Sequence, residues 1–222
     1  MQRFEAVIFD LDGTLVDSGS LVAQSAIETF QHFKFPTPTK AEIIAYMGIP
    51  IEVYFPKLAG PAFEAHDAKA VFADYRMRFK RLVESGHLKA FDGIADILAA
   101  LKTRGIKTGV ATSKETAPAV HSCEYAGLLP YLDAIVGSDL VKAYKPAPDT
   151  VLVCLEKIGL PSGPQVCVVG DAEADMGMGS GAGATTCGVT WGAHDAQRLA
   201  NQKPSHIVET RDDLARFLGI IP

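Results

Sequence analysis

Short apolar runs alternate along this chain with segments of helical periodicity, and this alternation constrains the fold more than any other feature. The runs are mostly β-branched or small, as expected of strands that are buried on both faces. They occupy residues 6–9, 108–111, 134–136, 166–169 and 185–189. Between them, segments such as 94–101 repeat apolar residues at helical spacing. The sequence therefore predicts an α/β fold, with a parallel sheet covered by helices on both faces.

The segment between residues 16 and 87 breaks this alternation, because it holds helical patterns and no convincing strand. Thr39 and Glu42 are spaced as a capping box, and Gly48 would end the helix that follows. The simplest interpretation is a helical domain at 16–87, inserted into a domain built from 1–15 and 88–222. Four basic residues near its end are interpreted as a solvated helix face: Arg76, Arg78, Lys80 and Arg81.

Charge and cysteine content exclude several classes of function. The 222 residues carry a formal net charge of -5, so the chain lacks the basic surface that nucleic-acid binding requires. None of its four cysteines forms a CxxC pair, which argues against a zinc site and predicts reduced thiols. The stretch MQRFEAVIFD resembles neither a leader peptide nor a membrane anchor. We expect a cytoplasmic protein that binds neither nucleic acid nor membranes.

Polar residues follow four of the predicted strands. The first strand ends in DLDGT, the second in TSK and the fourth in GDAEAD, while KPAPD comes after the third. Ligands of an open α/β sheet bind in the crevice at the carboxyl ends of the strands. We therefore expect one site formed by residues far apart in the sequence: Asp10, Asp12, Thr112, Lys145, Asp171 and Asp175.

These residue types favour phosphoryl transfer. Crowded carboxylates repel one another unless a cation neutralises them, and oxygen ligands suit Mg²⁺. A phosphate group needs a compact positive charge and hydroxyl or amide donors, which Lys145 and Thr112 provide. One carboxylate can attack phosphorus, and a second can protonate the leaving oxygen. Asp10 and Asp12, two positions apart, meet both needs, and Gly13 lets the chain turn away.

Each of these residues also has a simpler interpretation. Two carboxylates after a strand are usually helix caps or turn formers. Thr112 also fits a helix N-cap, Asp175 a first-turn acid, and Lys145 a solvated surface lysine. Their joint appearance at four strand ends favours phosphoryl chemistry.

FDLDGTLVDS, ATSK, KPAPD and GDAEADM resemble the four motifs of the haloacid dehalogenase superfamily, in that family's order and across nearly the whole chain. The resemblance implies a Rossmann-like core, bound magnesium and a covalent aspartyl intermediate. The inserted helices at 16–87 resemble the small α-helical cap of this family, and the remainder resembles its catalytic core.

By position, the resemblance assigns the nucleophile to Asp10 and the general acid/base to Asp12. It assigns phosphate binding to three residues: Thr112, Ser113 and Lys145. It assigns metal binding to four aspartates: Asp10 through its side chain, Asp12 through its backbone carbonyl, Asp171 and Asp175. Selectivity for the substrate would lie at cap residues 47–50 if the family pattern holds.

Asp12 narrows the range of reactions that the resemblance implies, because the dehalogenase and phosphonatase branches of the family lack an acid/base aspartate at this position. FDLDGTLVDS, GDAEADM and GVTWG most resemble phosphoglycolate phosphatases, with β-phosphoglucomutases as close relatives. We therefore expect a magnesium-dependent phosphatase, monomeric or homodimeric, that acts on a small phosphorylated metabolite such as a phosphoglycolate-like compound or a sugar phosphate. The alternatives are a sugar-phosphate mutase, a pyrophosphatase of the same fold and a binding module on a retired enzyme fold.

Overall fold

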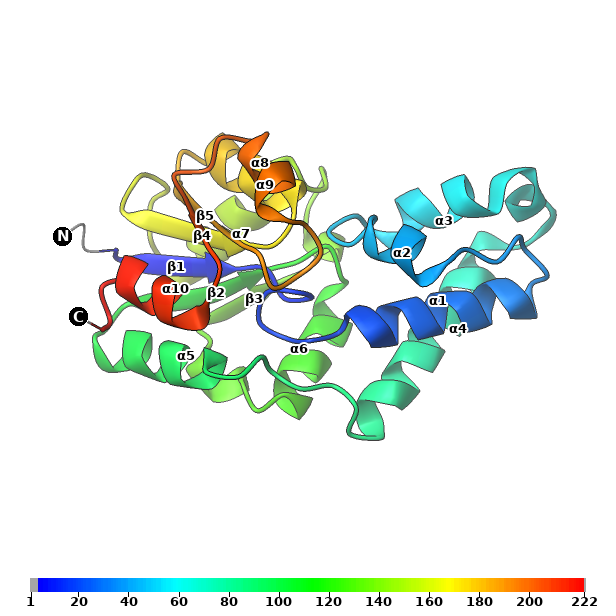
Figure 1. Ribbon diagram of the computed structural model, residues 1–222, viewed down its shortest axis with the longest axis horizontal. Coiled ribbons are helices and arrows are strands. Elements are labelled where there is room, and N and C mark those ends of the chain that lie inside the picture. Colours follow the sequence, from blue (N-terminus) through cyan, green and yellow to red (C-terminus); the bar gives the residue numbers. More distant parts are fainter. Residues whose placement is uncertain (1–3, 222) are drawn as a thin grey trace.

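The computed structural model describes residues 4–221 and contains a six-stranded parallel sheet with helices on both faces (Figure 1). The strand order is β3-β2-β1-β4-β5-β6. The strands are β1 (Ala6–Phe9), β2 (Lys107–Ala111), β3 (Ala134–Val136), β4 (Val166–Gly170), β5 (Thr185–Val189) and β6 (His206–Val208). The predicted α/β class and the five predicted strands are confirmed.

β1 lies at the centre of the sheet between β2 and β4, and its four residues are fully buried. Its side chains alternate between two hydrophobic clusters, because successive residues of a strand point to opposite faces. Val7 and Phe9 belong to the larger cluster, and Ala6 and Ile8 to the smaller one. This burial fixes the end of β1, and therefore Asp10, at the middle of the sheet edge.

Helices cover both faces of the sheet. Those that contribute to the larger cluster are α5 (Ile94–Thr103), α6 (Thr116–Tyr125) and α10 (Arg211–Phe217). Those that contribute to the smaller one are α7 (Asp149–Ile158) and α8 (Glu173–Gly181). The remaining short elements are η2 (Leu129–Tyr131), η3 (Ser138–Leu140) and α9 (Ala196–Ala200).

The sequence does not predict β6. This strand has three residues, lies at the edge of the sheet and buries only Val208. A run this short carries too little hydrophobic periodicity to be distinguished from a loop.

The inserted segment forms a helical cap beyond the carboxyl ends of the strands (Figure 1). Its elements are α1 (Gly19–His32), α2 (Lys40–Ile44), α3 (Ile51–Ala59), η1 (Gly60–Ala65) and α4 (Ala68–Glu84). The predicted capping box is confirmed: the Glu42 N–H donates to Thr39 Oγ1 at 3.2 Å, and the Thr39 N–H donates to Glu42 Oε2 at 2.7 Å. The helix ends at Ile44, before the predicted stop at Gly48, and turns fill the interval.

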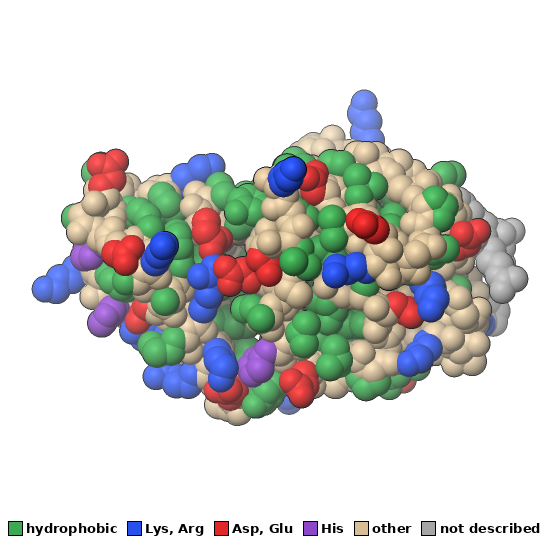
Figure 2. All heavy atoms as spheres, turned by 180° about the vertical axis from the view of Figure 1, so that it is seen from behind, with side chains coloured by type: hydrophobic (Ala, Val, Ile, Leu, Met, Phe, Trp, Pro, Cys, Tyr) green, Lys and Arg blue, Asp and Glu red, His purple; other side chains and the backbone are tan. Residues whose placement is uncertain are grey.

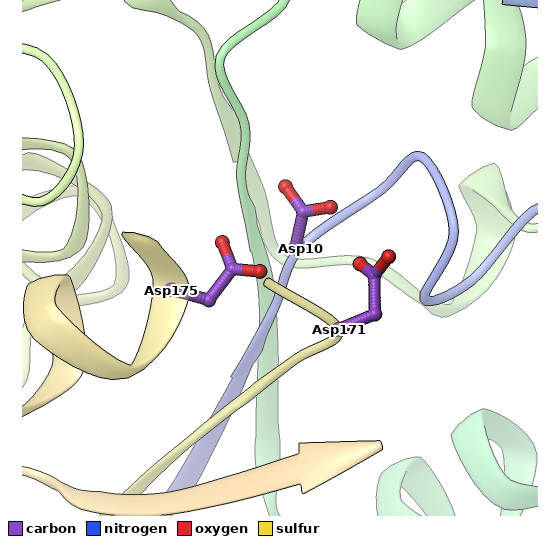
Figure 3. A group of neighbouring side chains, drawn as sticks. All are labelled: Asp10, Asp171 and Asp175. Carbon is purple, nitrogen blue, oxygen red and sulfur yellow. The ribbon is translucent and has the colours of Figure 1, made fainter. Parts of the chain in front are cut away.

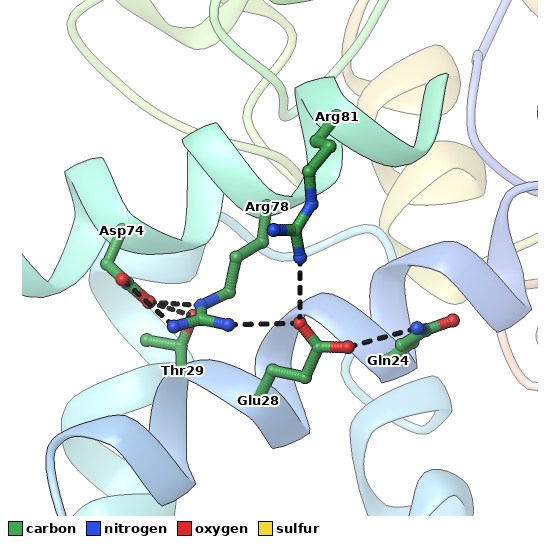
Figure 4. Close-up of polar contacts among 6 residues, drawn as sticks. All are labelled: Gln24, Glu28, Thr29, Asp74, Arg78 and Arg81. Carbon is green, nitrogen blue, oxygen red and sulfur yellow. Dashed lines mark hydrogen bonds and ion pairs between the residues drawn. The ribbon is translucent and has the colours of Figure 1, made fainter. Parts of the chain in front are cut away.

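A polar network joins α1 to α4 inside the cap (Figure 4). Arg78 Nε donates to Asp74 at 2.6 Å, and Arg78 Nη1 donates to Glu28 of α1 at 3.0 Å. Thr29 of α1 donates to the same Asp74 at 2.9 Å. The Arg78 side chain is only 17% exposed, so its predicted place on a solvated face is wrong.

The two segments that connect cap and core lie side by side. Val16 forms an antiparallel bridge with Ala90, and the Asp17 N–H donates to the Lys89 carbonyl at 2.9 Å. This pairing lies beside the predicted ends of the cap, and its boundaries at residues 16–87 stay a prediction.

Charged and apolar side chains are interspersed over the face shown in Figure 2. Within residues 4–221, no helix is both long and apolar enough to cross a membrane. All four cysteines are buried free thiols, as their spacing predicts.

Candidate active site

Three buried aspartates meet at the carboxyl ends of β1 and β4 (Figure 3). Asp10 directly follows β1, Asp171 directly follows β4, and Asp175 lies in the first turn of α8. One carboxylate oxygen from each lies within 4.8 Å of the others, and none of the residues is more than 3% exposed. Parallel pairing of β1 with β4 brings these distant residues together, as the strand-end pattern predicts.

Lys145 places an ammonium group against this aspartate cluster. Its Nζ lies 2.5 Å from Asp10 Oδ1 and 2.6 Å from Asp175 Oδ1. Burial alone would lower the pKa of Lys145, but the charges and hydrogen bonds of the two carboxylates outweigh burial and raise it. Lys145 is therefore charged and paired, and the simpler interpretation as a solvated surface lysine is wrong.

Three carboxylates and one ammonium leave an excess of negative charge. Burial and the neighbouring Asp175 raise the pKa of Asp171 above its ordinary range. Burial also raises the pKa of Asp10, although Lys145 opposes the change. A bound cation would relieve this crowding, and carboxylate oxygens are ligands that Mg²⁺ prefers. The donor set of the cluster therefore fits a metal ion.

Asp171 is oriented by donors from two loops. Thr14 Oγ1 donates to Asp171 Oδ1 at 2.8 Å, and the Ala193 N–H donates to Asp171 Oδ2 at 2.7 Å. Both loops approach the carboxylate so closely that a Cβ atom at Gly13 or Gly192 would lie 2.3 or 2.2 Å from Asp171 Oδ2. Thr14 and Ala193 are not identified as functional from the sequence. The only signal for the second loop is the GVTWG segment, which ends at Gly192.

The Asp12 carboxylate lies outside the aspartate cluster and pairs with Lys114 Nζ at 3.0 Å. The same ammonium group lies 4.0 Å from the centre of the Phe79 ring in α4, a cation–π contact. Lys114 thus connects the predicted acid/base to the cap. It belongs to the ATSK motif, but the sequence alone assigns it no role.

The two residues that follow β2 differ in their surroundings. Thr112 is buried, and its Oγ1 accepts a hydrogen bond from the Lys114 N–H at 3.2 Å. Ser113 Oγ donates to the carbonyl oxygen of Gly48 in the cap at 2.7 Å. The Ser113 hydroxyl is thus engaged by the cap here, and phosphate binding by both residues stays a prediction.

A cavity of about 440 Å³ lies between the cap and the core. On the core side it is lined by four of the predicted site residues: Asp10, Asp12, Thr112 and Ser113. On the cap side its lining includes residues 47–50, the positions predicted to set selectivity. Asp171 and Asp175 are not part of the lining, so they support the site from beneath it.

An ion-pair bridge joins the cap to the core beside this cavity. Arg76 of α4 lies 2.5 Å from Glu52 of α3 and 2.7 Å from Glu115, which precedes α6 in the core. The sequence predicts that Arg76 lies on a solvated helix face, and this prediction is wrong. Arg76 links the cap to the core.

A known protein family matches the sequence that carries these motifs. The model for haloacid dehalogenase-like hydrolases matches residues 7–189. The chain belongs to this family. The predicted resemblance is thereby confirmed. A haloacid dehalogenase-like hydrolase from Streptococcus pneumoniae superimposes with a TM-score of 0.84, at 25% identity over 98% of this chain and 99% of that one.

Several relatives are named as phosphatases. Probable phosphatase IndB of Dickeya dadantii is 34% identical over 92% of this chain and 89% of its own length. Pyrophosphatase PpaX of Bacillus pumilus is 30% identical over 96% of this chain and 95% of its own. Phosphoglycolate phosphatase of Shigella boydii is 27% identical over 99% of this chain and 96% of its own. These relationships confirm the predicted enzyme class, a phosphatase.

Proposed function

We propose that the protein is a magnesium-dependent phosphatase that hydrolyses a small phosphomonoester through an aspartyl phosphate. The position of Asp10 carries this proposal. Its carboxylate lies among Asp171, Asp175 and Lys145 on one side and lines the cavity between cap and core on the other. A nucleophile in this position can reach a phosphate in the cavity while cationic groups offset the charge of that phosphate.

The side chains of the core supply each step of the reaction. A carboxylate oxygen of Asp10 attacks phosphorus, and the bond between phosphorus and the ester oxygen breaks. Asp12 gives a proton to this oxygen, so that the alcohol leaves uncharged. Asp12 then takes a proton from a water molecule, whose oxygen attacks phosphorus. The bond between phosphorus and the Asp10 oxygen breaks, which releases inorganic phosphate and regenerates the Asp10 carboxylate. Lys145 offsets the charge of the phosphoryl oxygens, and Thr112 and Ser113 provide further donors.

The residues that would hold Mg²⁺ are Asp10, Asp171 and Asp175 through their carboxylates and Asp12 through its backbone carbonyl. When bound, the ion would offset the negative charge of the phosphate and the carboxylates. Thr14 and Ala193 fix the orientation of Asp171, as the partners of metal ligands commonly do.

Phosphate release from a panel of phosphomonoesters, with MgCl₂ and with EDTA, tests this proposal. Asp10→Asn should abolish release while circular dichroism shows an unchanged fold. Asp96→Asn makes the same chemical change on the exposed surface of α5 and should retain activity. Ordinary turnover by Asp10→Asn, or undiminished release in EDTA, would contradict the mechanism.

Two alternatives use the same residues. The similarity to PpaX favours a pyrophosphatase, and pyrophosphate therefore belongs in the panel. A sugar-phosphate mutase would isomerise a hexose 1-phosphate without releasing phosphate. The protein's location in the cytoplasm and its state as a monomer or homodimer remain predictions.

A further inference from the structure

The cap side of the cavity is largely apolar and aromatic. Nine apolar or aromatic residues form this wall: Val22, Met47, Ile49, Pro50, Ile51, Tyr54, Tyr75, Met77 and Phe79. Both tyrosines and Phe79 are buried in the protein. Burial raises the pKa of Tyr54 and Tyr75, so both remain uncharged phenols. The wall thus offers ring faces and aliphatic surface, and it carries no charge of its own.

The guanidinium group in the lining is already neutralised. Arg76 lies within 2.7 Å of two carboxylates, those of Glu52 and Glu115, and all three residues line the cavity. This group of three carries a net charge of -1 when all of its members are ionised. An anionic ligand placed beside it would meet two carboxylates as well as one guanidinium.

The other basic side chains of the lining have acidic partners as well. These pairs are Lys114 with Asp12, Lys80 with Glu84 and His121 with Glu84. Each cation among the lining residues, all of which fall within 4–221, has a carboxylate partner, and only Lys114 loses the charge of its partner, when Asp12 carries the proton that it donates. A buried charge without a partner is strongly unfavourable.

This arrangement is unsuited to two of the compounds that relatives are named for. Phosphoglycolate carries a carboxylate beyond its ester bond, and pyrophosphate carries a second phosphate. The cavity of about 440 Å³ also falls in the range of roughly 300–1,000 Å³ typical of sites for larger organic ligands. A two-carbon acid would leave most of its apolar wall without a contact.

We propose that the alcohol released by this phosphatase is uncharged and presents a ring-sized apolar surface to Tyr54, Tyr75 and Phe79. This inference rests on the proposed function and narrows its substrate class. Burial of apolar surface against the aromatic wall supplies the binding energy. The paired charges at Arg76 reject esters whose alcohol carries a carboxylate or a phosphate.

Two esters of matched shape and their smaller parent compound separate the charge of the alcohol from its size. They are benzyl phosphate, 4-carbamoylbenzyl phosphate and 4-carboxybenzyl phosphate, whose leaving alcohols have similar basicity. With MgCl₂ present, we expect kcat/KM for the two esters of uncharged alcohols to exceed that of 4-carboxybenzyl phosphate by at least about tenfold, since its carboxylate loses hydration without gaining a cation. Phosphoglycolate and pyrophosphate should be poorer substrates than benzyl phosphate.

A variant tests the charge of the lining directly. Glu52→Gln removes one of the two carboxylates at Arg76, so the ratio of kcat/KM between the carbamoyl and the carboxylate ester should fall about fivefold or more. Glu64→Gln is the matched control, because Glu64 is an exposed cap residue outside the lining. It should leave the ratio unchanged.

The outcomes distinguish this inference from the proposed function. If 4-carboxybenzyl phosphate or phosphoglycolate is hydrolysed as efficiently as benzyl phosphate, the inference is overturned and the phosphatase stands. An unchanged ratio in Glu52→Gln would also overturn it. Absence of phosphate release from every ester in MgCl₂ would refute the proposed function and this inference together.

Discussion

Asp171→Asn tests whether the aspartate cluster holds a divalent cation. At an effective dielectric constant of about 20, two unit charges 4.8 Å apart repel by about 3.5 kcal/mol. The substitution removes this repulsion and preserves the shape of the side chain. It also forfeits one of the hydrogen bonds from Thr14 and Ala193, because an amide has a single oxygen, at a cost of about 1–3 kcal/mol. In EDTA, its free energy of unfolding should therefore exceed the wild-type value by about 0.5–2.5 kcal/mol.

Magnesium should raise the Tm of the wild-type protein more than that of Asp171→Asn. A ligand at one hundred times its dissociation constant stabilises the folded state by about 2.7 kcal/mol. For a chain of this size, each kcal/mol raises the Tm by about 2–4 °C, so wild-type protein should gain about 5–11 °C. Asp171→Asn should lose most of this gain at the same concentration, because the site then has one carboxylate fewer.

Differential scanning calorimetry measures both quantities, with EDTA or MgCl₂ at matched ionic strength. Glu173→Gln is the control, because this side chain pairs with Arg198 at 2.8 Å on the surface, two residues from the cluster. It should keep the wild-type response to magnesium. An equal Tm increase in Asp171→Asn and wild type would refute the assignment of Asp171 as a magnesium ligand. A lost response in Glu173→Gln would refute the assumption that only the aspartate cluster binds magnesium.

Other features of the structure can be tested by substitution and labelling. Arg78→Met should lower the free energy of unfolding in urea by about 1–3 kcal/mol, because two cap carboxylates lose their shared donor; a value no larger than that of Arg81→Met, whose side chain is 68% exposed, would contradict this. Gly192→Ala should slow phosphate release at least about tenfold, since its Cβ would displace a carboxylate of the site. Gly19→Ala, with its nearest atom at 3.8 Å, should not. Ellman's reagent at pH 8 should label no thiol in the folded protein and all four thiols in guanidinium, because burial raises the pKa of each thiol in the folded protein. Labelling of the native protein would contradict the burial of Cys123, Cys154, Cys167 and Cys187.

The strand ends explain why so much of the site is predictable from the sequence. Once β1 and β4 are recognised as buried parallel strands, their geometry alone places Asp10 next to Asp171. The position of Lys145 needs the motif as well, because the segment that carries it follows an edge strand and has no regular structure. Its isolated sequence is indistinguishable from that of a surface lysine.

Contacts between the domains are not predictable in this way. The bridge from Arg76 to Glu115 depends on the angle at which α4 meets the core, and helical periodicity carries no information about this angle. The same applies to Lys114, whose partner Asp12 is distant in sequence and whose second contact is Phe79. Local patterns identify the chemistry of the core, whereas the cap contacts require the assembled structure.

Lys114 connects the cap to Asp12, the proposed acid/base. One ammonium group lies 3.0 Å from the proposed acid, Asp12, and 4.0 Å from the centre of the Phe79 ring in the cap wall. An alcohol seated against Phe79 therefore contacts the same surface that positions Lys114 beside Asp12. In the proposed mechanism, the group that contacts the cap and the oxygen that Asp12 protonates belong to one alcohol, so recognition and proton transfer would be coupled. Esters that leave the apolar wall unfilled should accordingly lose kcat as well as affinity, because binding energy remote from phosphorus helps to assemble the reacting groups.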